Sequence, residues 1–307
     1  MSYRSLETLD NQRYTSVNKY FGRIMLSDNP QALVSTSWLL KHLKDPDLRI
    51  LDGSWYLPKM NRNGFEEYNQ KHIPGARFFD IDEISDSNNE LPHMVPSAQK
   101  FISRMKAMGI GDGHQIVVYD GQGIFSSARV WWMFKLFGKN NVAVLDGGLP
   151  KWTSESNPTD NIKPILRERH ITVQYQASLI RDVTQVAACS KLSTATILDA
   201  RSISRFKGEE EEPRPGLRSG HIPGSKNLHY EILLNRDGTM KSQNLIREIL
   251  TDHGIDTTKA IITTCGSGVT AAILNLALEI AGYKNHSLYD GSWSEWGMYK
   301  DLKVDKG

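Results

Sequence analysis

The block KHIPGARFFD at residues 71–80 returns as GHIPGSKNLH at residues 220–229. Two more pairs of blocks repeat in the same order: RILDGSWYL (49–57) with TILDARSIS (196–204), and VAVLDGGLPKW (142–152) with HSLYDGSWSEW (286–296). Because the three pairs keep nearly the same offset along the chain, they indicate two copies of one domain of about 120–130 residues. The chain of 307 residues is long enough for both copies.

Within each copy, short β-branched segments alternate with helical patterns. The strand-like segments are LRILD, QIVVYD and VAVLD in the first copy and ATILDA, AIITTC and HSLYD in the second. Short apolar strands that alternate with helices predict an α/β fold, in which a mainly parallel sheet carries helices on both faces. We expect an N-terminal arm over residues 1–30, a first domain over 31–153, a linker over 154–177 and a second domain over 178–307.

The composition argues against several classes of partner. A formal net charge of +2 and the lack of a long Lys/Arg cluster speak against nucleic acid and anionic membranes. No stretch reaches the ~18 apolar residues of a membrane span, and the N-terminus lacks the pattern of a signal peptide. The two cysteines, Cys189 and Cys265, allow at most one disulfide, which fits a reducing compartment. We therefore expect a cytoplasmic protein, with Cys189 serving in the packing of a helix.

Cys265 follows the strand-like segment AIITT and precedes a helical run, with Gly266 and Gly268 in the connection. Ligands of open α/β sheets bind beyond the carboxyl ends of the strands, where this cysteine is expected. Glycines before a helix N-terminus let backbone N–H groups converge on an anion, and this lowers a thiol pKa from ~8.5. The corresponding position of the first copy holds Asp120. The pattern predicts a nucleophilic cysteine in the second copy only, although an inert buried thiol is the simpler alternative.

A P-loop is excluded at this position, because the required Gly-Lys-Ser/Thr ending is absent. An ordered set of motifs resembles instead the tandem-rhodanese sulfurtransferases, from about residue 32 to residue 305. These motifs are HIPGA and HIPGS, DGSWYLPK, FFDID, LPHMVP, ARVWWMF, LDGGLPKW, EEPRPGLRSGHIPG, CGSGVTAA and YDGSWSEWG. The resemblance implies two tandem rhodanese-like domains, the first catalytically silent and the second carrying the cysteine, in agreement with the Asp120/Cys265 difference.

The resemblance also implies an activity. An enzyme of this kind would move sulfane sulfur from 3-mercaptopyruvate, through a persulfide on Cys265, to thioredoxin, a small thiol or cyanide, and release pyruvate. The loop residues expected to stabilise the negative sulfur through their backbone are Gly266, Ser267, Gly268, Val269 and Thr270. No cofactor and no metal is implied.

The side chains of this loop bear on the choice of donor. Relatives that prefer thiosulfate carry Cys-Arg-Lys-Gly-Val-Thr, whereas this chain has the uncharged CGSGVT, which favours 3-mercaptopyruvate. The Ser267 hydroxyl could relay a proton to the departing enolate, or it could bond only its own backbone.

Two arginines match those with which the family binds the donor. A guanidinium suits a carboxylate, so Arg205 and Arg214 are expected to bind the substrate. The alternative is that they neutralise the acidic run Glu209–Glu212.

A histidine opens HIPG in both copies, as His72 and His221, and the ordinary role of such a residue is to orient the turn. The resemblance assigns His72 to a relay with Cys265 and Ser267 across the domain interface and gives His221 no such role. The active site is therefore expected in the cleft between the copies.

The acid of this relay is not evident in the sequence. The family has an acidic residue about ten positions before its relay histidine, whereas Asn61 and Asn63 precede His72. An asparagine orients an imidazole but does not stabilise its cation, so either Glu66 or Glu67 substitutes or the link is dispensable.

Three other functions remain to be compared with this one. A thiosulfate sulfurtransferase of the same fold is disfavoured by the neutral loop. A Cys-x5-Arg phosphatase is excluded, because Ala271 stands at the sixth position after Cys265. A non-catalytic rhodanese module would tolerate loss of Cys265, Arg205 and Arg214, all of which are present.

Overall fold

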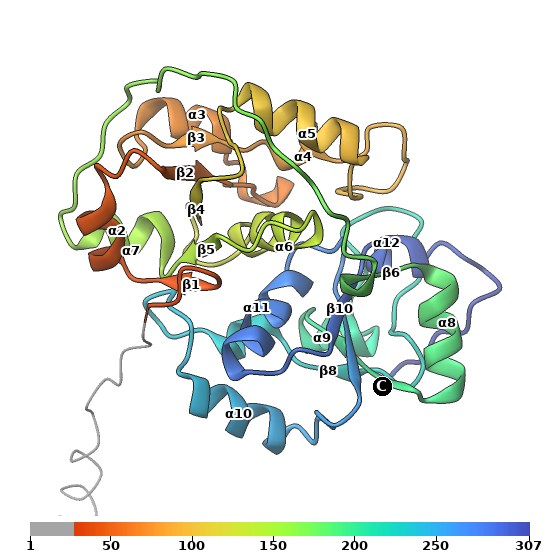
Figure 1. Ribbon diagram of the computed structural model, residues 1–307. Helices are drawn as coiled ribbons and strands as arrows, with labels where there is room; N and C mark the ends of the chain where they lie inside the picture. The colour runs from red at the N-terminus through yellow and green to blue at the C-terminus, as the bar shows by residue number, and fades with distance from the viewer. Residues whose placement is uncertain (1–27) are drawn as a thin grey trace, which may run out of the picture.

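The two copies of the repeat form two five-stranded sheets in the computed structural model, which describes residues 28–307 (Figure 1). The strand orders are β1-β5-β4-β2-β3 and β6-β10-β9-β7-β8, and every strand pair is parallel. The strands are β1 (Leu33–Val34), β2 (Leu48–Asp52), β3 (Arg77–Phe78), β4 (Gln115–Tyr119), β5 (Val142–Leu145), β6 (Ile180–Arg181), β7 (Ala195–Asp199), β8 (Lys226–Asn227), β9 (Ala260–Thr264) and β10 (His286–Tyr289). The predicted α/β fold with two equivalent copies is confirmed.

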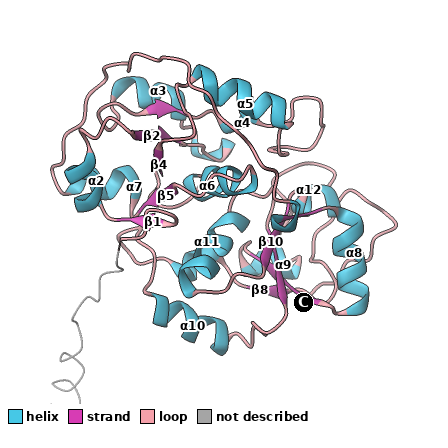
Figure 2. Ribbon diagram, viewed as in Figure 1, coloured by secondary structure: helices cyan, strands magenta, loops and turns pink. Residues whose placement is uncertain are grey.

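Helices cover both faces of each sheet (Figure 2). The first sheet has α2 (Thr36–His42), α3 (Gly64–Gln70), α4 (Ile81–Ile84), α5 (Ala98–Ala107), α6 (Ser127–Leu136) and α7 (Gly148–Ser154). The second has α8 (Val183–Leu192), α9 (Ile203–Lys207), α10 (Gln243–Asp252), α11 (Ala271–Ala281) and α12 (Ser292–Trp296). Three 3₁₀ turns complete the described elements: η2 (Pro58–Met60), η3 (Ala177–Leu179) and η4 (Tyr230–Leu233). None of the helices in residues 28–307 has the length and apolar character needed to cross a membrane.

The domains meet through α6 and α11, which contact each other between the two sheets (Figure 1). Both helices are apolar almost all round, as expected of helices buried on every side. One core cluster of buried side chains runs from the first domain through these helices into the second. The interface is therefore continuous with the cores of both domains, which fixes the relative position of the loops beside it.

The predicted linker, residues 154–177, overlaps the chain between α7 and η3, where residues 155–176 form no helix and no strand beyond a single bridge. The domain boundaries themselves stay predictions. Of the expected N-terminal arm, residues 1–27 lie outside the described residues. Cys189 lies in α8, as expected, and packs against a core cluster of the second domain.

The loop after β4 of the first domain is closed by its own carboxylate. Asp120 is buried, and its side chain accepts hydrogen bonds from the backbone N–H groups of Gln122 (2.8 Å), Phe125 (2.8 Å) and Ser127 (2.9 Å). These donors lie just before α6, where helical N–H groups lack partners within the helix. The carboxylate thus occupies the anion position of the loop.

Asp120→Ala is expected to destabilise the protein, because it leaves three buried N–H groups without an acceptor. We expect the Tm to fall by about 5–10 °C, from the effect of lost charge-assisted hydrogen bonds on a domain of this size. The measurement is thermal unfolding followed by circular dichroism. Asp256→Ala is the matched control, because Asp256 accepts from the Thr258 N–H in an exposed turn. An equal, small shift for both variants would contradict this role of Asp120.

Candidate active site

Cys265 lies directly after β9, at the carboxyl edge of the second sheet, and is only 2% exposed. Its backbone carbonyl accepts from the Trp293 N–H (3.0 Å), and the Gly266 carbonyl accepts from the Ser294 N–H (2.8 Å). Helix α12 therefore engages the carbonyl side of the loop. Within the described chain, no backbone N–H of residues 266–270 has a hydrogen-bond partner. In the loop after β4, the Asp120 carboxylate binds the equivalent backbone N–H groups. In the loop after β9, these N–H groups thus stay available to bind an anion.

A hydrogen-bonded relay reaches this loop from the first domain. The Ser267 Oγ lies 3.0 Å from the Nδ1 of His93, and the His93 Nε2 lies 3.1 Å from the Oδ1 of Asp82. The indole Nε1 of Trp55 donates to the other carboxylate oxygen of Asp82 (3.0 Å), and its ring meets the imidazole edge-on at 4.7 Å. Hydrogen bonding to His93 holds the pKa of Asp82 below its usual range. The acid is therefore charged at neutral pH and fixes the orientation of the imidazole.

The expectation that His72 contacts Ser267 is wrong. The His72 side chain is fully buried in the first domain, with Nδ1 2.7 Å from the Tyr68 carbonyl and Nε2 3.2 Å from the Asp160 carboxylate and 3.3 Å from the Ile162 carbonyl. Its ring stacks on Tyr68. The physical reason is that HIPG forms a turn whose histidine packs back on the preceding helix and on the linker, so both ring nitrogens are engaged far from the loop.

His221, the counterpart of His72, is held in the same way. Its Nδ1 lies 2.8 Å from the Phe206 carbonyl, and its ring stacks on Phe206. Both copies therefore use the first residue of HIPG to fix a turn.

The acid behind the relay was also sought beside the wrong histidine. Asn63 caps α3 with its side chain, and Glu67 pairs with Arg62 at 2.6 Å. Neither contacts His93, whose acid is Asp82. The expected spacing of about ten positions between acid and histidine is met by this pair. Both residues lie in the motifs FFDID and LPHMVP, which were the available signal in the sequence.

The two arginines differ in their partners. Arg205 pairs with Glu212 at 2.5 Å, and a Cβ placed on Gly266 would lie 3.1 Å from its Nη2, so its guanidinium borders the loop. Arg214 is partly buried and has no hydrogen bond or ion pair with the described residues; burial lowers its pKa, while the nearby charge of Cys265 acts to raise it. The predicted neutralisation of the acidic run thus applies to Arg205, whereas Arg214 lies near the sulfur without a partner.

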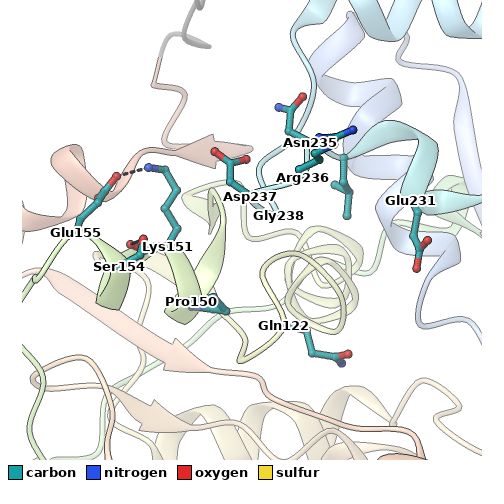
Figure 3. A pocket seen from close by; sticks show the side chains of 11 residues that line it. Gln122, Pro150, Lys151, Ser154, Glu155, Glu231, Asn235, Arg236, Asp237 and Gly238 are labelled. Atoms are coloured by element: carbon teal, nitrogen blue, oxygen red, sulfur yellow. Dashed lines mark hydrogen bonds and ion pairs between the residues drawn. The ribbon is translucent and has the colours of Figure 1, made fainter.

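An open cavity of about 820 Å³ lies on the opposite side of the interface, at the loop that holds Asp120 (Figure 3). It is lined by Gln122 of that loop, by α7, and by the turn around Arg236 in the second domain. Lys151 and Glu155 pair along its edge. None of the relay residues borders this cavity, which lies instead at the first domain's equivalent of the Cys265 loop.

The model of the rhodanese-like domain matches residues 35–155 and again residues 183–299. The chain is 40% identical to 3-mercaptopyruvate sulfurtransferase of Escherichia coli, over 89% of this chain and 97% of that protein. It is also 40% identical to thiosulfate/3-mercaptopyruvate sulfurtransferase 1, mitochondrial, of Arabidopsis thaliana, over 90% of this chain and 78% of the relative. The crystal structure of SseA from Escherichia coli, titled as the rhodanese fold of 3-mercaptopyruvate sulfotransferases, superposes with a TM-score of 0.79 at 38% identity, covering 86% of this chain and all of that one. With two matched domains and relatives of this identity along most of its length, the chain belongs to the rhodanese-like family, in the form that joins two such domains in tandem.

Proposed function

We propose that this chain is a 3-mercaptopyruvate sulfurtransferase, in which Cys265 carries the transferred sulfur as a persulfide. The observation that carries the proposal is the contact of the second domain's Ser267 with the His93–Asp82 pair of the first domain, two residues from the only cysteine at a strand end. A binding module has no use for such a relay. The names of the relatives agree with this activity.

The first half-reaction forms the persulfide. The Cys265 thiolate attacks the donor sulfur and forms the S–S bond, while the C–S bond breaks and its electron pair leaves with pyruvate as the enolate. In the second half-reaction an acceptor thiolate or cyanide attacks the outer sulfur, and the S–S electron pair returns to Cys265 as thiolate. The unpartnered N–H groups of residues 266–270 are suited to stabilise the negative sulfur in both steps.

The relay moves the proton that these two half-reactions require. With the His93 Nε2–H donated to Asp82, Nδ1 is the acceptor that faces the Ser267 hydroxyl. Ser267 can then pass the proton of the donor's thiol to His93, whose cation Asp82 stabilises, and return it to the enolate.

Recognition of the donor is assigned to Arg214 and Arg205. Of these two guanidinium groups, that of Arg214 has no partner among the described residues, and it lies near the charge of Cys265, as a group that binds the donor's carboxylate must. Arg205 borders Gly266 while held by Glu212, which suits contact with the neutral keto group beside that carboxylate. The uncharged side chains of residues 266–270 favour 3-mercaptopyruvate over the thiosulfate dianion.

The acceptor is proposed to be a thiol, such as thioredoxin or a small thiol, or cyanide. Cys265 is 2% exposed and Ser267 6% exposed, so an acceptor has to be small or has to present its sulfur on a narrow segment. Both cysteines are unpaired in the structure, which supports a reducing compartment, and we propose the cytoplasm.

Cys265→Ser is expected to abolish turnover of 3-mercaptopyruvate, because an alcohol cannot carry the sulfane sulfur. In the unsubstituted protein, kcat/KM for 3-mercaptopyruvate should exceed that for thiosulfate. Both donors are compared in steady-state assays with cyanide as the common acceptor, and Cys189→Ser is the matched control that keeps full activity. A larger kcat/KM for thiosulfate, or an active Cys265→Ser variant, would show that the proposal is wrong.

His93→Gln is expected to lower kcat/KM for 3-mercaptopyruvate by about 100-fold, the usual effect of losing one general acid–base group. Activity with thiosulfate should change much less, because sulfite departs without needing a proton. His72→Gln, the control, should reduce the Tm but leave kcat/KM for both donors within about twofold, since His72 only packs a turn. If His72→Gln lost activity and His93→Gln kept it, the relay assignment would have to be abandoned.

A further inference from the structure

Arg129 of α6 bridges the two domains beneath the catalytic loop. Its side chain is fully buried, and Nη2 donates both to the His93 carbonyl (2.6 Å) and to the Oδ1 of Asp290, the residue after β10 (2.6 Å). The other oxygen of Asp290 accepts from the Val95 N–H (2.8 Å). Arg129 and Asp290 therefore hold the chain immediately after the His93 side chain.

The guanidinium also touches the loop of Cys265. A Cβ placed on Gly268 would lie 3.0 Å from the Arg129 Nη1, so only a glycine fits at this distance. Nη1 and Nε of Arg129 are buried and have no hydrogen-bond partner among the described residues, although the ring of Trp132 lies 4.6 Å below the guanidinium. An incompletely paired buried cation is unfavourable for stability, which indicates that its position serves another purpose.

The backbone of His93 explains that purpose. Its φ is 61°, in the left-handed region that non-glycine residues enter only at an energetic cost. This conformation directs the imidazole to Ser267. The bonds that Arg129 makes to the His93 carbonyl and Asp290 makes to Val95 retain the left-handed conformation.

The side of the interface at the Asp120 loop, called here the silent side, has the same turn but no arginine equivalent to Arg129. There the Met240 N–H donates to Asp146 (2.8 Å), as Val95 donates to Asp290. This match places Gly238 opposite His93, and Gly238 has φ of 78° without a side chain to strain. Alignment of the starts of α6 and α11 places Ile273 opposite Arg129. The silent side thus lacks both the imidazole and the arginine.

We propose that Arg129 is a positioning residue, which holds His93 against Ser267 so that the relay forms only when the two domains are docked. The proposal rests on the relay of the proposed function. Arg129 does not touch the reacting atoms and acts only through the His93 carbonyl and Asp290.

The test compares Arg129→Met and Asp290→Ala with Asp146→Ala, which removes the equivalent interface bond on the silent side. Single-turnover release of pyruvate from 3-mercaptopyruvate should slow by about 30-fold in the first two variants, a substantial part of the relay's effect. Their activity with thiosulfate should change by less than about threefold. Asp146→Ala should keep both activities, whatever its Tm.

The pH dependence separates positioning from a loss of stability. In the unsubstituted protein, the pH profile of kcat/KM for 3-mercaptopyruvate should show an acidic limb that depends on the intact relay, and Arg129→Met should lose this limb. The groups facing the imidazole are Ser267 from the second domain and, from the first, Asp82 and Trp55. Arg129→Lys, which keeps one cationic donor, should recover part of the rate and of the acidic limb.

Equal losses with both donors, or the same losses in Asp146→Ala, would overturn the proposal, since either result is what a structural role predicts. If Arg129→Met fails to fold, Asp290→Ala and Arg129→Lys give the same readouts. His93→Gln is assayed in parallel. An active His93→Gln variant refutes the relay itself, whereas an inactive His93→Gln beside an active Arg129→Met refutes only the positioning role.

Discussion

Both domains have backbone N–H groups that converge between a parallel strand and the following helix, and such groups need a negatively charged partner. The rest of this molecule depends on how each copy provides that partner. After β4 the partner is the Asp120 carboxylate, which accepts three of these groups and closes the loop. After β9 the side chain is Cys265, and the N–H groups of residues 266–270 have no partner among the described residues. The same fold therefore gives a self-satisfied loop in one domain and a loop that favours a sulfur anion in the other.

The loop after β9 also needs side chains from the other domain to contact it. Because α6 and α11 pack against each other between the sheets, the turn after β3 of the first domain reaches the loop after β9 of the second. The corresponding turn of the second domain reaches the loop after β4, where Gly238 approaches Gly123. The two sides of the interface thus differ at three pairs of equivalent positions: Cys265 and Asp120, His93 and Gly238, and Arg129 and Ile273.

This asymmetry explains what could be read from the sequence. The repeat predicted the two sheets and their helices, because each copy must bury its own strands and helices. Cys265 and Ser267 could also be found, since the strand, the loop and the helix that position them are local in the chain. The contact of His93 with Ser267 was not predicted, although the motif LPHMVP contains this histidine, because the contact joins two loops of different domains and neither loop has a regular period. Arg129 was hidden in the apolar pattern of α6.

The resemblance assigned the relay to His72, although both copies share its motif, and the structure shows why a shared residue does not take this role. A residue retained in both copies serves what both copies do, which is to fold: His72 and His221 stack on an aromatic ring and bond a carbonyl in the same way. A role that only one copy has must depend on residues that differ between the copies.

The interface carboxylates Asp146 and Asp290 also differ in their surroundings between the two copies. Asp146 and Asp290 accept equivalent backbone bonds, and burial raises the pKa of Asp146 to about 6. A carboxyl group whose pKa is raised by folding binds protons more strongly in the folded state, so its ionisation weakens the silent side as the pH rises from about 4 to 6. Asp290 has the Arg129 guanidinium at 2.6 Å to oppose the penalty of burial. The side that holds His93 is therefore the side on which a buried guanidinium pairs with the interface carboxylate.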